Sequence, residues 1–195
     1  MQMRDFENRR NRLRERLNDS DFLANKGLGN EAGIFTFCYD PTLEMEARSY
    51  FKEIVSDSKN GKFCAGEIKA TIHERNLYDL LLQICEKKRI LDRLPKQEER
   101  RGQSAMLRQL QRIATPEAFV TAMDWSPHEL GDVLLITGVG EVYPFVRVHN
   151  ILNNMQSTFR DVPVVVAYPG VYDGGSLSLF GRLNDGHYYR AFDLI

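Results

Sequence analysis

The stretches Asp132–Thr137 (DVLLIT) and Val162–Tyr168 (VPVVVAY) decide the fold class of this chain. Each is a short apolar run, rich in β-branched residues, with the length of a β-strand. Neither run alternates apolar with polar residues, which is typical of strands that are buried on both faces. We therefore expect both to lie in a sheet that helices cover on either side.

Further strands and amphipathic helices surround these two runs. The other predicted strands are Ile34–Tyr39, Ala70–His73 and a last strand within His187–Leu194, at an edge. Helices are predicted over Arg4–Leu17, from Asp40-Pro41 through Val55, from the cap Asn76 through Cys85, through Met106 and Ile113, from Thr115, and over Val142–Gln156. This alternation implies β-α-β crossovers and a parallel sheet.

The predicted fold class is α/β. We expect a single domain over residues 1–195, with a mainly parallel sheet of about five strands and helices on both faces. This is a Rossmann-like or P-loop-like three-layer sandwich without a Walker A motif. Residues 1–24 are predicted to hold an arginine-rich helix, and residues 86–126 a helical insertion or connector, in which Arg93–Arg101 is an exposed linking segment.

Composition excludes several classes of protein. Twenty-six Lys and Arg against 27 Asp and Glu give a net charge of −1, so no global charge favours nucleic acid or an anionic membrane. Cys38, Cys64 and Cys85 share no C-x-x-C spacing and are interpreted as buried thiols in a reducing compartment. The start is too charged for a signal peptide, and no apolar run approaches the ~20 residues of a membrane span. These features predict a cytoplasmic protein.

The loop after Asp132–Thr137 is a candidate ligand site. Its residues Gly138, Gly140, Glu141 and Tyr143 stand where ligands gather in parallel sheets, beyond the carboxyl end of a strand. Two glycines would let the backbone approach a phosphate. However, the loop has no Walker A lysine and no third glycine of a dinucleotide fingerprint. A tight strand-to-helix turn is the favoured interpretation.

Four carboxylates near predicted strand ends offer the main route to an enzyme: Asp40, Glu74, Glu141 and Asp173. Gathered together, they would bind Mg²⁺ for phosphoryl chemistry. Their positions at caps and turns explain them without a metal, and this is the favoured interpretation. No serine lies in a G-x-S-x-G motif, the four histidines lack metal-ligand spacing, and Cys38 lies in an apolar strand. We therefore predict no catalytic residues, no metal and no cofactor.

The predicted helix over Val142–Gln156 has one unusual face. Its apolar side is expected to pack on the sheet, and its other side carries Arg147, His149, Asn150, Asn153 and Asn154. Asparagine is a mediocre helix former, so three of them suggest a surface that makes hydrogen bonds to a partner. Ordinary exposed residues are the alternative interpretation.

The N-terminal helix carries six arginines, which would track a phosphate backbone. Acidic residues dilute this charge, and no aromatic residues interleave for base stacking. A solvated face or a docking site for an acidic partner is favoured over DNA binding.

Five blocks of sequence resemble the BrxB family of BREX phage-defence systems. They run in order along nearly the whole chain and are least similar between Glu86 and Ser126. The blocks are NKGLGNE (25–31), FCYDP (37–41), NLYDLLLQI (76–84), LLITGVGEVYPFVRVHNILNNMQ (134–156) and YPGVYDGGSLSLFGRLNDGHYYRAF (168–192).

The resemblance implies a role beside the other BREX proteins, namely a methyltransferase, an ATPase and the alkaline-phosphatase-like PglZ protein. Of these, PglZ is the expected direct partner, and any contact with DNA is expected to be indirect or weak. The family supplies no catalytic residues to carry over. The resemblance thus implies a non-catalytic component that supports host DNA methylation and phage exclusion. A nucleotide-binding domain using the Gly138–Gly140 loop with Mg²⁺, and a DNA-contacting subunit, are the alternatives.

Overall fold

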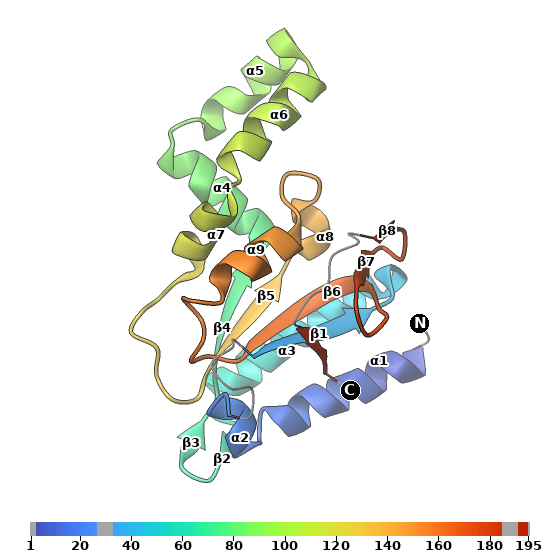
Figure 1. The fold of residues 1–195 in the computed structure, drawn as a ribbon, viewed down its shortest axis with the longest axis vertical. Coiled ribbons are helices and arrows are strands. Elements are labelled where there is room, and N and C mark those ends of the chain that lie inside the picture. The colour runs from blue at the N-terminus through green and yellow to red at the C-terminus, as the bar shows by residue number, and fades with distance from the viewer. Residues whose placement is uncertain (1–2, 27–32, 185–190, 195) are drawn as a thin grey trace.

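A computed structural model describes residues 3–26, 33–184 and 191–194 of the chain (Figure 1). The strands are β1 (Ile34–Tyr39), β2 (Cys64–Ala65), β3 (Ile68–Lys69), β4 (Thr71–Asn76), β5 (Asp132–Thr137), β6 (Val164–Tyr172), β7 (Leu177–Leu179), β8 (Leu183–Asn184) and β9 (Ala191–Asp193). The helices are α1 (Met3–Arg16), α2 (Ser20–Leu23), α3 (Glu44–Lys59), α4 (Leu77–Lys87), α5 (Leu94–Arg101), α6 (Gln103–Ile113), α7 (Pro116–Met123), α8 (Val139–Val142) and α9 (Val148–Met155). Two 3₁₀ turns, Pro41–Leu43 and Leu91–Arg93, lead into α3 and α5.

The main sheet has the strand order β4-β5-β6-β1-β9, and each of these neighbouring pairs is parallel. Strands β7 and β8 extend it by antiparallel pairing from β6. The α/β class and the mainly parallel sheet are thus confirmed. The last strand lies at an edge, beside β1, as predicted; residues 187–190 of that prediction lie outside the described residues.

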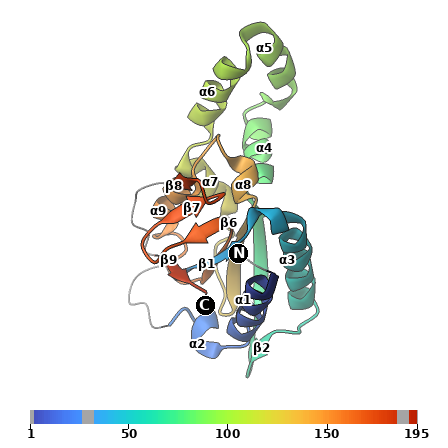
Figure 2. The same cartoon turned by 90° about the vertical axis from the view of Figure 1, so that its right-hand side faces the viewer.

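Helices cover both faces of the sheet (Figures 1 and 2). Successive residues of the central strands point to opposite faces. Leu135 and Val165 pack into a core with α1, α2 and α3. Leu134 and Val166 pack into a second core with α4, α6, α7 and α9. Because both cores are apolar, the central strands carry no polar alternation.

The predicted strands are largely confirmed. Strands β1 and β5 have the predicted bounds, while β6 starts two residues later than predicted and continues to Tyr172. Strand β4 was predicted to end at His73 but continues through Glu74 and Arg75 to Asn76. It lies at the edge of the sheet, where only one neighbour and a half-buried environment tolerate polar residues.

The prediction of a single helix over Val142–Gln156 is wrong. The chain forms the short helix α8, then an irregular stretch, and α9 begins only at Val148. Pro144 explains the break, because a proline inside a helix removes a hydrogen bond and clashes with the preceding turn. Tyr143, before it, has extended backbone, as residues before proline prefer.

Helices α5 and α6 form a hairpin that projects from the body of the molecule (Figures 1 and 2). The segment Arg93–Arg101, predicted as a linking segment, is therefore mostly helical, although it is exposed as expected. Cys64 also departs from prediction: it is exposed in the short strand β2, whereas Cys38 and Cys85 are buried. Within the described ranges, no helix is long and apolar enough to cross a membrane.

Candidate functional site

The glycine loop after β5 is a close-packed turn. Gly138 has a φ of +73°, in the left-handed region that favours glycine. A Cβ atom here would lie 2.5 Å from Oδ1 of Asn76, which caps α4. The same Asn76 oxygen accepts hydrogen bonds from the backbone N–H groups of Tyr78 and Asp79, at 2.9 and 3.1 Å. Glycine is therefore required so that the start of α8 can approach the cap of α4.

Glu141 of α8 is held by neighbouring polar side chains. Arg48 of α3 donates to Glu141 and to Glu44, each at 2.8 Å, and Nδ2 of Asn76 donates to Glu141 at 3.4 Å. Hydrogen bonds to Glu44 and Glu141 raise the pKa of Arg48. Tyr39 donates to the other oxygen of Glu44 at 2.8 Å. Glu141 thus has a protein cation as its counter-ion.

The cavity beside this loop is small, with a volume of about 110 Å³. Its lining includes Tyr39, Glu44, Arg48, Glu74, Asn76, Thr137, Gly138 and Glu141. Pockets that hold drug-sized ligands usually measure about 300–1,000 Å³. The space fits a few water molecules, and the geometry favours the tight-turn interpretation over a phosphate site. Tyr143 lies elsewhere, beside Arg147 and Tyr168, at a space of only about 10 Å³.

The four candidate carboxylates do not share one site. Glu74 and Glu141 line the small cavity, where the Thr137 hydroxyl donates to Glu74 at 3.0 Å. Asp40 lines a separate hollow, at the ends of β1 and β6. Across the described part of the chain, no three His, Cys, Asp or Glu residues are placed so that they could hold a metal ion.

Asp40 and Asp173 act as local caps. The hydroxyl and the backbone N–H of Thr42 donate to Asp40 at 2.7 and 2.9 Å, and these hydrogen bonds lower the pKa of Asp40 to about 2. Asp173 accepts bonds from the N–H groups of Gly175 and Ser176, at 3.1 and 2.7 Å. Both carboxylates have the cap and turn roles that their sequence positions indicate.

The outer face of α9 presents most of the predicted partner-binding residues. Arg147, Asn150, Asn153 and Asn154 are exposed, whereas His149 is buried, with 7% of its surface exposed. His149 lies one residue after Val148 and three before Leu152, which are both buried, so it borders the packed side of α9 and its assignment to the outer face was wrong. We define the four exposed residues as the α9 face.

The α9 face has amide groups available for a partner. Asn154 donates to the backbone oxygen of Asn150 at 2.8 Å, within the helix. The side chains of Asn150 and Asn153 make no hydrogen bond to any residue that the structure describes. Two exposed amides therefore offer donors and acceptors to solvent or to another protein.

An open apolar groove of about 530 Å³ lies between the α5–α6 hairpin and the stretch that precedes α9. We call it the hairpin groove; its lining is Leu94, Pro95, Glu98, Gln103, Ser104, Met106, Leu107, Leu110, Pro144 and Phe145. Gln111 donates to the backbone oxygen of Pro144 at 3.0 Å and ties the hairpin to this stretch. Phe145 of the groove lies two residues before Arg147, the first residue of the α9 face. The two surfaces are therefore neighbours in the sequence. Sequence reasoning missed the groove, since its two sides come from distant segments.

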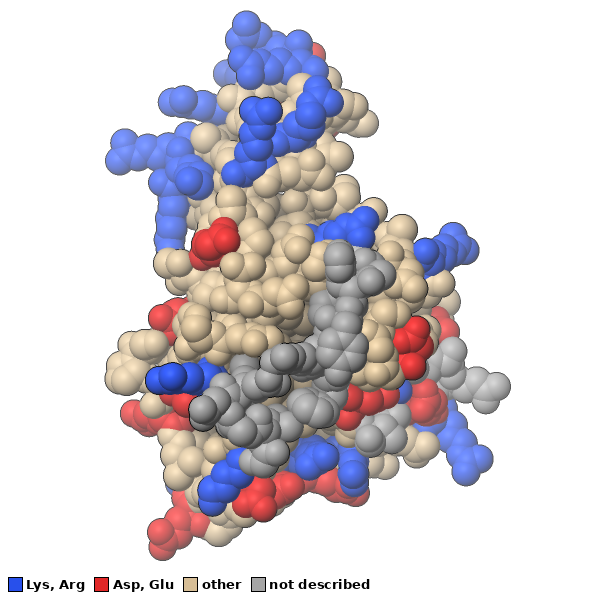
Figure 3. Space-filling model, in the orientation of Figure 1, with Lys and Arg blue, Asp and Glu red and all other residues tan. Residues whose placement is uncertain are grey.

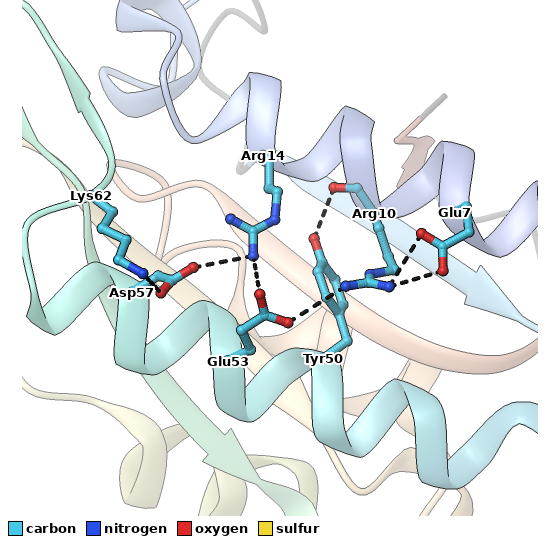
Figure 4. Close-up of polar contacts among 7 residues, drawn as sticks. All are labelled: Glu7, Arg10, Arg14, Tyr50, Glu53, Asp57 and Lys62. Atoms are coloured by element: carbon cyan, nitrogen blue, oxygen red, sulfur yellow. Dashed lines mark hydrogen bonds and ion pairs between the residues drawn. The ribbon is translucent and has the colours of Figure 1, made fainter.

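Several N-terminal arginines contact residues of other elements in the same chain. Arg14 donates to Glu53 and Asp57 of α3, at 2.7 and 3.1 Å, and Arg10 packs over the ring of Tyr50, 4.8 Å from its centroid (Figure 4). Arg9, one of the six arginines of the N-terminal helix, is 5% exposed and pairs with Asp193 at 2.6 Å. These contacts fasten α1 to the body and favour a structural role over DNA binding.

A second polar cluster joins β4 to β5. His73 and Trp125 both contact the buried carboxylate of Asp132, each at 3.0 Å, and their rings stack with centroids 4.0 Å apart. The backbone N–H of Glu129 donates to the same carboxylate at 2.9 Å. Burial alone would raise the pKa of Asp132, but these hydrogen bonds outweigh it and lower the pKa. The cluster fastens the connection between α7 and β5, and no spacing in the sequence indicates it.

Comparison with known proteins identifies the family. The family model described as "BREX protein BrxB" matches residues 73–194, which is more than half of the chain. The chain belongs to the BrxB family. A BREX protein BrxB of Bacillus cereus (strain H3081.97) is 36% identical over 196 residues, covering 99% of both chains. Another, from Escherichia coli O9:H4 (strain HS), is 27% identical over 195 residues, covering 97% of this chain and 92% of the relative.

The region that matches the BrxB model contains the glycine loop, the hairpin groove and the α9 face. No solved structure is significantly similar to the chain. The resemblance to the BrxB family is thus confirmed, and the family places the protein in a BREX phage-defence system.

Proposed function

We propose that this protein is a non-catalytic interaction component of its BREX system, acting in the cytoplasm. The proposed direct partner is the alkaline-phosphatase-like PglZ protein, and the complex would support host DNA methylation and phage exclusion. The observation that carries the proposal is the hairpin groove, an open apolar surface next to the amide-bearing α9 face. Apolar patches with a polar rim are typical of protein-binding surfaces.

The two parts of this surface would contribute differently. Leu107 and Phe145 are partly exposed in the groove and offer apolar area for burial. Asn150 and Asn153 offer amides that make no hydrogen bond within the described ranges, and these favour a partner with matching hydrogen-bond groups. Protein interfaces usually combine such an apolar centre with hydrogen bonds around it.

Substitution of the α9 face tests the proposal. We expect Asn150→Lys with Asn153→Lys to weaken the complex with purified PglZ by about tenfold or more, because two buried charges would lack partners. Calorimetry or surface plasmon resonance measures the affinity. The melting temperature should change by less than about 2 °C, since both side chains are exposed.

Asn8→Lys with Asn11→Lys is the matched control. These two asparagines are also exposed and three residues apart on a helix, so the charge change and the helical spacing are identical. The control should bind PglZ as the unmodified protein does. Equal affinities for all three proteins would show that the α9 face is not the interface.

A nucleotide-binding function makes a different prediction. If the Gly138–Gly140 loop bound a nucleotide with Mg²⁺, adding both would raise the melting temperature, and Glu141→Ala would abolish the increase. We expect no increase, because the cavity measures about 110 Å³ and Glu141 is paired with Arg48. A reproducible increase that depends on Glu141 would favour the enzyme class instead.

A further inference from the structure

Positive charge is concentrated on the α5–α6 hairpin and on the connection that leads into it from the end of α4. Residues 86–113 contain nine Lys and Arg and four Asp and Glu, a net charge of +5. The whole chain has a net charge of −1, so the remainder has −6. Figure 3 shows the consequence: Lys and Arg dominate the projecting hairpin, whereas both signs mix over the body. A chain that is nearly neutral therefore has one strongly basic end.

The nine cations of residues 86–113 differ from the arginines of α1 in their contacts. None of the nine makes an ion pair with a residue that the structure describes. On α1, by contrast, Arg9, Arg10 and Arg14 are paired with carboxylates of other elements. Unpaired cations held together on a projection repel one another and favour an anionic ligand.

Three of the cations line one hollow between the two helices. Arg101, Arg108 and Arg112 line a hollow of about 490 Å³, together with Gln97 and Gln109. Arg108 and Arg112 are four residues apart and so lie one above the other on α6. Helical spacing places them opposite Met106, Leu107 and Leu110, which line the hairpin groove. The basic side and the apolar side are thus separate surfaces of the hairpin.

We propose that the basic side of this hairpin binds the phosphate backbone of duplex nucleic acid without reading its sequence. Arginine and glutamine are donors that suit phosphate oxygens, and arginine can contact a phosphate with two N–H groups. Residues 86–113 contain no Phe, Tyr or Trp, so the hairpin offers no platform for unstacked bases. This favours a duplex over a single strand. The inference goes beyond the proposed function, because it assigns a second ligand to a different surface.

Salt-dependent binding of the full chain tests this inference. The probe is a fluorescently labelled duplex DNA of mixed sequence, about two helical turns long, and anisotropy reports binding as the salt is raised from about 50 to about 200 mM. We expect binding at low salt that weakens at least tenfold over this range. Changing Arg101, Arg108 and Arg112 to Gln should lower the low-salt affinity at least tenfold and reduce the salt slope by about 2 to 3.

The matched control changes Arg4, Lys52 and Lys59 to Gln. These three cations are exposed on α1 and α3, so both triple variants have the same net charge. The control should retain the affinity and the salt slope of the unmodified chain. Because glutamine is a good helix former and all six positions are exposed, both variants should keep the unmodified melting temperature.

Three results would overturn the inference. One is the absence of binding at low salt, and another is an equal loss of affinity in the two triple variants. The third is binding of poly-glutamate as tight as that of the duplex, which would indicate an acidic protein ligand instead. Each is independent of whether PglZ binds the hairpin groove.

Discussion

At the residue scale, Gly138 is the position at which the loop after β5 tolerates no side chain. Alanine there would be strained by the φ of +73° and would meet the Asn76 amide at 2.5 Å. Gly61 has a nearly equal φ of +69° but nothing within 4 Å of its Cβ position. Alanine would cause similar backbone strain at both positions but would be crowded only at Gly138. Comparing the two substitutions therefore distinguishes the cost of strain from the cost of crowding.

We predict that Gly138→Ala lowers the free energy of unfolding by about 3 kcal/mol, against about 1 to 2 kcal/mol for Gly61→Ala. Urea denaturation of both variants measures the difference. Equal losses would mean that Asn76 moves aside without cost, and the loop would then have room to open for a ligand.

Asp132 links stability to pH. Its pKa is lowered in the folded protein by hydrogen bonds from the Glu129 N–H, Trp125 and His73, which outweigh the effect of burial. The unfolded chain therefore takes up a proton at a higher pH than the folded chain does. The stability that Asp132 contributes is present above the ordinary carboxyl pKa of 3.8 and is lost as the pH falls through the lower folded value.

We accordingly predict that Asp132→Asn destabilises the protein by about 1 to 3 kcal/mol at neutral pH. The difference from the unmodified protein should shrink as the pH falls below about 4. Denaturant unfolding at several pH values measures it. A difference that stays constant with pH would show that the carboxylate charge contributes nothing.

At the element scale, α1 is held to α3 by its arginines. Arg14 contacts two carboxylates of α3, whereas Arg12, among the residues that the structure describes, pairs only with Glu15 of its own helix, at 3.2 Å. We predict that Arg14→Ala costs about 1 to 2 kcal/mol of unfolding free energy, and Arg12→Ala less than about 0.5 kcal/mol. Thermal denaturation of the two variants measures this, and a similar cost for both would contradict the docking role of Arg14.

The sequence predicts elements well where burial sets the pattern. Most residues of β1 and β5 are apolar because helices cover both faces, and their bounds follow from that. Strand β4 is an edge strand whose polar residues resemble a loop, so its last residues were missed. Helix α9 was placed too early because Pro144 indicates a helix start in other contexts but ends α8 here.

The candidate site could be predicted only in part. The exposed asparagines of α9 follow from helical spacing, which is local information. The burial of His149, at the border of the apolar side of α9, depends on how the helix packs on the body, and the hairpin groove depends on how distant segments pack. The pairing of Glu141 with Arg48 joins residues 93 positions apart, which no short motif encodes.

At the scale of the whole molecule, the fold separates two surfaces. The body carries the net negative charge, and the α5–α6 hairpin carries positive charge on one side and the apolar groove on the other. A protein with this distribution is suited to connecting ligands of different chemistry, which is consistent with an interaction component of a multi-protein system.

The central claim is that the α9 face and the hairpin groove bind another BREX protein. Affinity capture of the tagged chain from cells that carry the complete operon tests it most directly. We predict that PglZ is recovered with the unmodified protein and with the Asn8→Lys, Asn11→Lys control, and is largely lost with Asn150→Lys, Asn153→Lys. Recovery of no BREX protein, or equal recovery of PglZ by all three, would contradict the account.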